Sequence, residues 1–537
     1  MRNQSMARGF AVLSAAGIIT KVMSLLYIPF FIAIIGEEGY GIYAAALQVY
    51  VFIYVIGNSG IPVAISKSVS ELTATDNYKD AYRVFKIARS YLFIIGLLLS
   101  LIMFFTAGPI SAALHYKKSK LAIAAISPTI LLTTLMSAYR GYFQGRGNMV
   151  PTAVSQIIEQ IVNMIFTVVF AMILINVSIE AACAGGTIGT SLGALAAMVI
   201  LIISFRRNKD SIIPEEYRKV KVKRYTYKQL AFKIVNYSIP ITVCVGMQYA
   251  GNLIDLWNTK SRLLAAGFSD EVATAMYGYL TKYQQLMNAP ISIVSALASA
   301  VLPAITAAVA INDKKEVRFR MNHAFKLCFM VVIPSTVAFT ILSDELFKLL
   351  KYGQGSFLLL YGSSVLIFMS VVQIQTSVLQ GAGKLYKVTA NLMLGIFAKI
   401  ILNYILIGIP QINIMGNIIG SIVGYTIPVI LNQREIRAST GIKVRLVRHA
   451  KMPLISCVPM AISVLIIYKV TYFIFGFLGS DYLSNAIAFI ASALTGVAVY
   501  FYSMLYTGGI DEKDMEMIPS KIRRFIPMSS ASAKAVK

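Results

Sequence analysis

The sequence predicts an all-α integral membrane protein with about 14 transmembrane helices, and three observations support this fold class. Hydrophobic runs of about 20 residues recur from Phe10 to Leu505 in a chain of 537 residues. As an α-helix, such a run spans a bilayer core and satisfies its own backbone hydrogen bonds. The Lys and Arg residues gather in alternate loops between the runs, and the second half of the pattern repeats the first.

The expected helices follow the apolar runs in chain order, and each ends where charged residues or turn residues interrupt the run. The first run is too long for the apolar part of a cleavable signal peptide, so it should remain as a helix. The expected spans cover residues 10–35, 41–66, 88–108, 121–143, 152–176, 181–205, 233–257, 275–308, 324–343, 357–380, 387–409, 414–432, 452–476 and 483–506.

The basic residues predict how the chain is oriented. The N-terminus and every second loop after it hold 38 of the 49 Lys and Arg residues, whereas the other loops hold seven. By the positive-inside rule, both termini are therefore expected in the cytoplasm. The formal charge of +26 then indicates attraction to anionic lipids of the inner leaflet. Nucleic acid is not an expected partner, because most of this charge lies in short loops at the membrane.

An internal repeat predicts two parallel lobes. Tyr40-Gly41 with Gln48 matches Tyr277-Gly278 with Gln285 at an offset of 237 residues. Each copy holds six helices, an even number, so both copies enter the membrane in the same direction and place a substrate site between them. We expect an N-terminal lobe at 1–205, a basic cytoplasmic linker at 206–232, a C-terminal lobe at 233–440, two further helices within 441–507 and a disordered cytoplasmic tail at 508–537.

Five ionisable residues inside expected spans are candidate site residues, namely Lys21, Glu159, Asp255, Lys282 and Lys399. A charge at the centre of a span costs about 2.5–3.5 kcal/mol, so such residues usually face a cavity or a partner. We expect the three lysines to line a substrate cavity, and the two acids to serve in gating or ion coupling.

Simpler roles remain open for three of these residues. Asp255 could pair locally with Lys260 or Arg262, and Glu159 could pair with Arg140. Lys399 could bind carbonyl groups between helices, or extend its ammonium group to the membrane interface.

Several chemistries are not expected. Cys183, Cys244, Cys328 and Cys457 are isolated, and the chain has no CxxC or HExxH spacing, so neither a metal site, a disulfide framework nor a cofactor is predicted. A membrane polysaccharide polymerase or ligase would need catalytic groups on large external loops, and the expected external loops are mostly under about 20 residues.

Three motifs resemble a known family. They are Gly60-Ile61-Pro62-Val63-Ala64-Ile65-Ser66-Lys67, Arg140-Gly141-Tyr142-Phe143-Gln144-Gly145, and Pro151-Thr152-Ala153-Val154-Ser155-Gln156 followed by Glu159-Gln160. They look like the group of stage V sporulation protein B and MurJ (YtgP)-type proteins, within the multidrug/oligosaccharidyl-lipid/polysaccharide (MOP) exporter superfamily. The resemblance implies two six-helix lobes, with helices 13 and 14 forming a groove for a lipid tail.

The resemblance also implies a function. It implies a flippase of the bacterial cytoplasmic membrane that moves an undecaprenyl-pyrophosphate-linked sugar, either lipid II or a related polysaccharide or spore cortex precursor. We expect no covalent catalysis, and we expect transport to be coupled to the membrane potential, Na+ or H+. Cell-wall synthesis proteins are expected partners. The predicted pyrophosphate cavity then contains Lys21, Lys282, Lys399 and Gln285, and its cytoplasmic mouth contains Lys67, Arg140 and Arg146.

Physical reasoning favours an anionic substrate. A pyrophosphate group cannot cross hydrocarbon unassisted, and buried lysines would attract it. A multidrug or cation antiporter of the same superfamily is the first alternative, but its site would favour acids, and the candidate charges comprise two acids against three lysines. A membrane polymerase or ligase, a channel and a structural scaffold are further alternatives.

Overall fold

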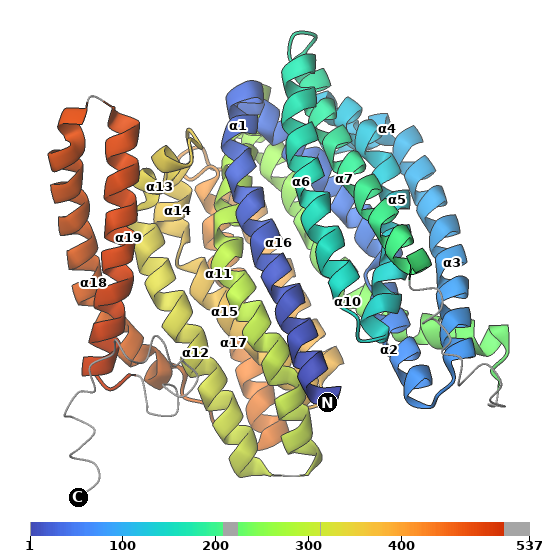
Figure 1. Cartoon of the computed structure of the whole chain (residues 1–537). Coiled ribbons are helices and arrows are strands. Elements are labelled where there is room, and N and C mark those ends of the chain that lie inside the picture. Colours follow the sequence, from blue (N-terminus) through green and yellow to red (C-terminus); the bar gives the residue numbers. More distant parts are fainter. Residues whose placement is uncertain (1, 208–223, 312, 479, 510–537) are drawn as a thin grey trace, which may run out of the picture. The chain divides into compact units, whose positions relative to one another are not determined.

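The computed structural model describes residues 2–207, 224–311, 313–478 and 480–509, which form helices joined by short turns (Figure 1). No strand occurs in these residues. Twelve of the described helices are long and apolar enough to cross a membrane, or up to 13 if the bent pair α14 (Ser356–Gly362) and α15 (Val365–Gly381) forms one span. The expected all-α, multi-pass membrane protein is confirmed.

Helix α1 (Arg2–Asn58) contains two of the expected spans. Gly36, with φ of 71° and ψ of −177°, interrupts the helical backbone within it. A straight helix of 57 residues would be about 85 Å long, far more than the hydrocarbon core of a bilayer. The runs at 10–35 and 41–66 therefore lie on the two sides of Gly36. If α1 is counted as two spans and the bent pair as one, the described helices account for the 14 expected spans.

The boundaries differ from the expectation at several points. The second span ends at Asn58, because Gly60 and Pro62 begin a separate helix, α2 (Ile61–Ala74). Helix α3 (Tyr78–Phe105) begins ten residues before the apolar run, since its basic first turns are also helical. The span expected at 357–380 is the pair α14 and α15, which is bent by 57°.

The other helices match the remaining expected spans, and two short helices were not expected. The short ones are α4 (Ala107–Ala113) and α13 (Ser343–Leu349). The others are α5 (Lys120–Gly145), α6 (Val150–Leu174), α7 (Ile179–Arg207), α10 (Tyr227–Ala265), α11 (Asp270–Ala310), α12 (Lys314–Ile341), α16 (Leu385–Leu406), α17 (Met415–Thr440), α18 (Leu446–Phe475) and α19 (Asp481–Tyr506).

The chain divides into two compact units. Unit 1 comprises Met1–Leu286 with Ile396–Gly420, and unit 2 comprises Met287–Gly395 with Ser421–Lys537. This division follows contacts, whereas the predicted lobes follow the sequence repeat, and the predicted lobe boundaries stay a prediction. Most of the predicted linker (208–223) and almost all of the predicted tail (510–537) lie outside the described residues.

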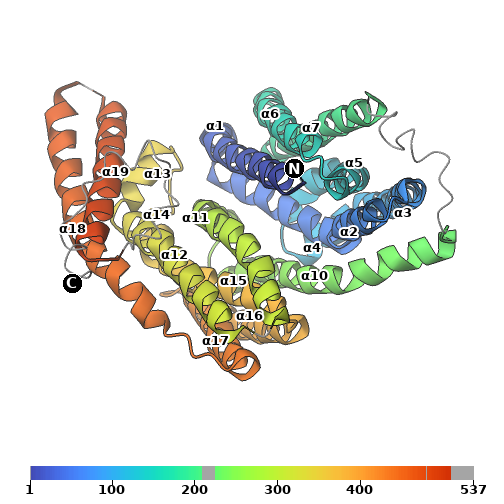
Figure 2. The same ribbon diagram turned by 60° about the horizontal axis from the view of Figure 1, so that its bottom comes forward.

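Unit 1 is built around an aromatic core. Phe85 of α3 packs against Tyr139 of α5 and Phe205 of α7, with ring centroids 5.0 and 4.8 Å away. Leu230 and Ile234, in the first turns of α10, are buried in the same core. The start of α10 thereby lies against α2 and α3 (Figures 1 and 2).

Unit 2 contains α12, α15, α17 and the C-terminal pair α18 and α19. Gln375 of α15 donates a hydrogen bond to the carbonyl oxygen of Val429 in α17, at 3.1 Å. Tyr500 of α19 donates to the carbonyl oxygen of Met330 in α12, also at 3.1 Å. The expected helices 13 and 14 are α18 and α19, and the groove for a lipid tail beside them stays a prediction.

Candidate functional site

Helices α1 and α11 cross within unit 1 at two glycines. A Cβ atom on Gly41 would overlap the carbonyl oxygen of Thr274, and a Cβ atom on Gly278 would lie 3.2 Å from the carbonyl oxygen of Glu37. Only glycine permits so close an approach of two helix backbones. The offset of 237 residues relates Gly41 to Gly278 and also Glu37 to Thr274. The crossing therefore joins matching positions of the sequence repeat.

An ion pair with a buried lysine holds this crossing. The Lys282 Nζ atom donates to Glu37 Oε2 at 2.5 Å, and the Lys282 side chain is 0% exposed. The same ammonium group lies 4.8 Å from the ring centroid of Tyr279. One turn further along α11, Gln285 accepts a hydrogen bond from the Tyr40 hydroxyl at 3.1 Å. Lys282 and Gln285, both predicted for the cavity, thus bind α1, and their role in substrate binding stays a prediction.

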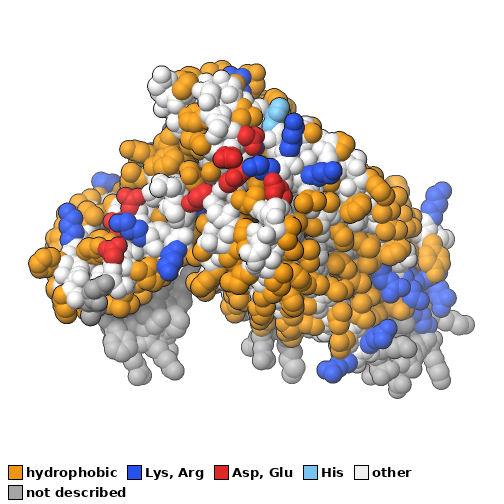
Figure 3. Space-filling model, turned by 90° about the horizontal axis from the view of Figure 1, so that it is seen from above, with side chains coloured by type: hydrophobic (Ala, Val, Ile, Leu, Met, Phe, Trp, Pro, Cys, Tyr) orange, Lys and Arg blue, Asp and Glu red, His pale blue; other side chains and the backbone are white. Residues whose placement is uncertain are grey.

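Two more ion pairs each have one partner near this crossing in the sequence, Glu38 or Asp270. Lys118 binds Glu38 at 2.6 Å, and Lys260 binds Asp270 at 2.9 Å. Together with the pair of Glu37 and Lys282, we call these three pairs the ionic layer. Figure 3, which views the molecule of Figure 1 from above, shows acidic and basic side chains near one another on this face. In each of the three pairs at least one side chain is partly exposed, so water can compete with the ion pair.

Asp255 pairs with a residue far away in the sequence. Its carboxylate binds the Lys399 ammonium group of α16, and it accepts a hydrogen bond from Asn403 Nδ2 at 2.9 Å. Lys260 and Arg262, which the sequence offers as local partners, bind other groups instead. The idea of a local pair is therefore wrong. The buried carboxylate finds its cation on a neighbouring helix.

Glu159 and the three predicted mouth residues also lie in unit 1. Arg140 binds Glu159 Oε2 at 2.6 Å, so the expected pairing of these two residues is confirmed. Lys67 and Arg146 each lie over a tyrosine ring, 3.9 and 4.9 Å from the ring centroid. Each charge is thus held by another helix or by an aromatic ring. The predicted roles of these residues in gating and at the mouth stay predictions.

Lys21 differs from the other four candidate charges. It is exposed on α1, and it forms no ion pair within the described residues. The hydroxyl of Thr20 donates to the carbonyl oxygen of Gly17 at 2.9 Å, and that of Ser24 donates to the carbonyl oxygen of Thr20 at 2.8 Å. Lys21 therefore belongs to a polar stripe on an otherwise apolar stretch of helix.

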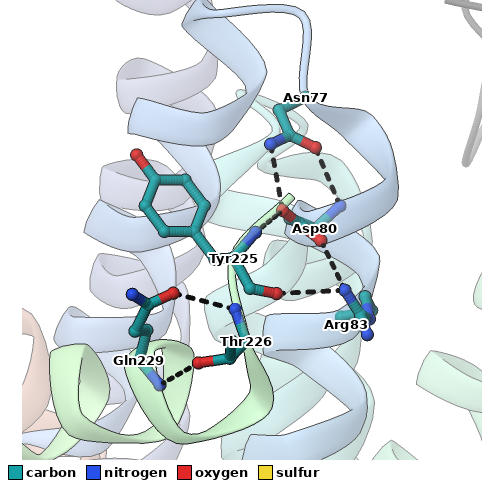
Figure 4. Close-up of polar contacts among 6 residues, drawn as sticks. All are labelled: Asn77, Asp80, Arg83, Tyr225, Thr226 and Gln229. Atoms are coloured by element: carbon teal, nitrogen blue, oxygen red, sulfur yellow. Dashed lines mark hydrogen bonds and ion pairs between the residues drawn. The ribbon is translucent and has the colours of Figure 1, made fainter. Parts of the chain in front are cut away.

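Sequence reasoning missed a second polar centre, formed around Asp80 (Figure 4). This buried carboxylate accepts hydrogen bonds from Asn77 Nδ2 at 3.0 Å and from the Tyr225 backbone N–H at 2.9 Å. Arg83 binds Asp80 at 3.0 Å and donates to the Tyr225 carbonyl oxygen at 3.2 Å. Thr226 then begins α10 with a capping box. We call the contacts of Asp80 and Arg83 with Tyr225 the latch, because they dock the start of α10 on α3.

The missed residues had only weak signals in the sequence. Asn77, three residues before Asp80, is a typical helix N-cap residue. This pattern does not indicate that the Asp80 carboxylate also binds a distant segment. Glu37 and Glu38 follow Gly36 directly and fall between the spans expected at 10–35 and 41–66, so they are not conspicuous as charges in an apolar run. Among the described residues, no group of three His, Cys, Asp or Glu residues could hold a metal ion.

Comparisons with known proteins agree with the motifs. Residues 6–309 match the family described as "Polysaccharide biosynthesis protein". Stage V sporulation protein B of Bacillus subtilis (strain 168) is 26% identical over 458 residues, which cover 84% of this chain and 87% of that protein. Lipid II flippase MurJ of the same organism is 26% identical over 522 residues, which cover 93% of this chain and 95% of that protein. The resemblance stated from the motifs is confirmed.

Solved structures show the same fold. A lipid II flippase MurJ in an inward closed conformation aligns with a TM-score of 0.65 at 16% identity, over 93% of this chain and 98% of that one. A multidrug resistance transporter of the MATE family, within the MOP superfamily and in an inward-facing conformation, aligns with a TM-score of 0.62 at 15% identity. That alignment covers 79% of this chain and 96% of the transporter. Both likenesses concern the fold alone.

Proposed function

The chain belongs to the polysaccharide biosynthesis protein family, and on this premise we propose that it is a flippase for an undecaprenyl-pyrophosphate-linked sugar. The substrate is lipid II or a related polysaccharide or spore cortex precursor. The protein moves this substrate across the bacterial cytoplasmic membrane by alternating access and without covalent catalysis. The names of the two Bacillus subtilis relatives support this substrate class.

The exposed Lys21 carries the proposal. Of the five charged residues that the sequence singles out as site candidates, four are ion-paired with another residue, and Lys21 forms no ion pair within the described residues. An ammonium group facing hydrocarbon would cost about 2.5–3.5 kcal/mol, whereas water or an anion offsets that cost. A pyrophosphate headgroup supplies such an anion, while its polyprenyl tail stays in the lipid.

The ionic layer suits alternating access. A transporter of this kind needs contacts that hold in one state and break in another. The crossing of α1 and α11 offers such contacts, because water can replace an ion pair once a path to it opens. We propose that the pair of Glu37 and Lys282 closes a pathway in this conformation. Its opening would release Lys282 toward the substrate, driven by the membrane potential, Na+ or H+.

The proposed orientation places both termini in the cytoplasm. Anionic inner-leaflet lipids are then partners of the basic loops, and cell-wall synthesis proteins would supply and consume the substrate. A reporter that is active only outside the cytoplasmic membrane should be silent when fused after Arg448 and active when fused at Asp481. The reverse pattern would overturn the orientation.

Complementation of a strain depleted of its lipid II flippase tests the function. The wild-type chain and Lys21→Arg should restore growth, since a guanidinium group keeps the charge and matches phosphate geometry. Lys21→Gln should fail at equal membrane abundance, because losing a charged contact to phosphate lowers affinity about ten- to a hundredfold. Lys469→Gln is the matched control, because Lys469 is an exposed lysine of another span, α18.

Reconstituted vesicles separate the alternatives. Translocation of a fluorescent undecaprenyl-pyrophosphate sugar should depend on Lys21 in the same way as growth. Full translocation by Lys21→Gln would contradict the anionic-headgroup proposal. Efflux of cationic dyes without translocation of the lipid would instead support the multidrug antiporter, whose fold this chain shares.

A further inference from the structure

A groove opens between α3 and the first turn of α10, within unit 1 and outside the site described above. Its volume is about 530 Å³, within the usual range for small-ligand sites. Lys86 and Ser90 of α3 and Lys228 of α10 line one part of it, while Ile87, Tyr91 and Ile94 of α3 line the other. No acidic residue lines the groove. It therefore joins a basic surface to an apolar one.

Both helices change from charged to uncharged along this groove. Helix α3 carries its last charge at Arg89, and residues 90–105 contain none. In α10, Lys233 is followed by an uncharged stretch over 234–254. The change from basic to apolar sequence marks where a span passes from headgroups into hydrocarbon. The lysines of the groove thus lie at headgroup level, and Ile94 lies at the level of acyl chains.

The two lysines differ from their neighbour Arg83. Arg83 is bound to Asp80 and lies over the Tyr227 ring, 4.4 Å from its centroid. Lys86 and Lys228 are exposed, and neither forms an ion pair within the part of the chain that the structure describes. The Lys86 ammonium group lies over the Tyr82 ring, 4.7 Å from its centroid. Two cations at the top of an apolar groove complement an anionic headgroup that carries acyl chains.

We propose that this groove binds an anionic phospholipid of the inner leaflet. The phosphate group binds Lys86 and Lys228, with the Ser90 hydroxyl as a further donor, and one acyl chain lies along Tyr91 and Ile94. The assignment to the inner leaflet rests on the orientation proposed above. The site itself does not depend on the transported substrate.

A bound lipid would also brace the latch. Tyr227 lines the groove, and the Arg83 guanidinium group lies over its ring. Arg83 also forms the ion pair with Asp80 and the hydrogen bond to the Tyr225 carbonyl oxygen. A phosphate group between Lys86 and Lys228 bridges the same two helices, α3 and α10, without disturbing those contacts. The lipid would therefore hold the start of α10 in place and raise the temperature at which the protein unfolds.

Native mass spectrometry of the purified full-length protein in a neutral detergent tests the site. Phosphatidylglycerol and the zwitterionic phosphatidylethanolamine are titrated separately, and thermal unfolding is followed in parallel. The wild type should bind phosphatidylglycerol more tightly and unfold at a higher temperature with it. The double variant Lys86→Gln, Lys228→Gln should lose about thirtyfold in affinity for phosphatidylglycerol, at about fivefold for each lysine.

Two further variants make the test specific. Lys314→Gln, Lys315→Gln removes the same charge from exposed lysines at the start of α12 and should bind like the wild type. Ser90→Trp fills the groove with both lysines in place and should weaken binding of phosphatidylglycerol. Equal losses in both lysine pairs, or equal binding of the two lipids by the wild type, would overturn the proposal.

A soluble headgroup distinguishes a lipid site from a phosphate site. Glycerol phosphate, which lacks acyl chains, should not compete with phosphatidylglycerol at equal concentration. Effective competition would show that the lysines bind phosphate alone and would refute the lipid assignment. These readouts involve no transport, so failure of the flippase proposal would leave them unchanged, and their failure would leave the flippase proposal standing.

Discussion

Removing either partner of the ion pair between Glu37 and Lys282 should destabilise the protein, but by different amounts. The Lys282 side chain is 0% exposed, whereas the Glu37 side chain is 26% exposed. Removing the carboxylate with Glu37→Gln takes the anion of this pair away from a fully buried ammonium group, which costs about 3–5 kcal/mol. The Tyr279 ring offsets only about 1 kcal/mol of this. Removing the lysine with Lys282→Met leaves a carboxylate that can turn to water, at a cost of about 1–3 kcal/mol.

Thermal unfolding of the purified protein, followed by intrinsic fluorescence, tests which of the two variants is less stable. Glu37→Gln should lower the unfolding temperature more than Lys282→Met does. The double variant should be more stable than the sum of the two effects implies, because neither partner is then left alone. Glu38→Gln is the matched control, since its partner Lys118 is 37% exposed and an exposed pair contributes less than about 1 kcal/mol.

Two results would refute this reasoning. Equal destabilisation by Glu37→Gln and Lys282→Met would mean that the burial of Lys282 does not control the cost. Strict additivity in the double variant would mean that the two side chains do not interact. The same variants also test the proposed gate, because breaking the pair should increase the labelling of a cysteine at Tyr279 by a water-soluble reagent in a background without the native cysteines.

The remaining predictions concern the glycine crossing and the second buried pair. Gly41→Ala should destabilise the protein by about 1–3 kcal/mol, because its Cβ atom overlaps a backbone oxygen of α11. Gly17→Ala is the control, since no atom lies within 4 Å of its Cβ position, and it should not destabilise the protein in the same thermal assay. Lys399→Met should cost about 3–5 kcal/mol by leaving the Asp255 carboxylate without its cation, and adding Asp255→Asn should recover part of this loss. A Lys399→Met variant as stable as the wild type would contradict the importance of that pair.

The sequence predicted the spans well because each one obeys a local rule. A run of about 20 apolar residues must be helical in hydrocarbon wherever it occurs, so every expected span has a counterpart among the helices. Boundaries were less predictable, since α3 starts ten residues before its apolar run. Basic residues at headgroup level are as helical as the apolar residues that follow them, and hydropathy does not mark the first turn of such a helix.

Candidate charges were also predictable, because a lysine or carboxylate in an apolar run is conspicuous whatever the fold. Their partners were not predictable by the same means. Glu159 and Arg140 are 19 residues apart and were paired correctly, whereas Lys282 and Glu37 are 245 residues apart. Asp255 has two basic residues nearby in the sequence and binds neither, because Lys399 of α16 lies against it.

The sequence by itself determined which segments enter the membrane and which side chains are costly there. Composition and periodicity along one helix are sufficient for both. Only the tertiary structure decided that Lys282 is buried against Glu37, that Lys21 is left exposed, and that Asp80 holds Tyr225. These outcomes depend on which helix faces meet. The crossing of Gly41 with Gly278 is set by close packing between two segments, and the sequence of neither segment identifies the other.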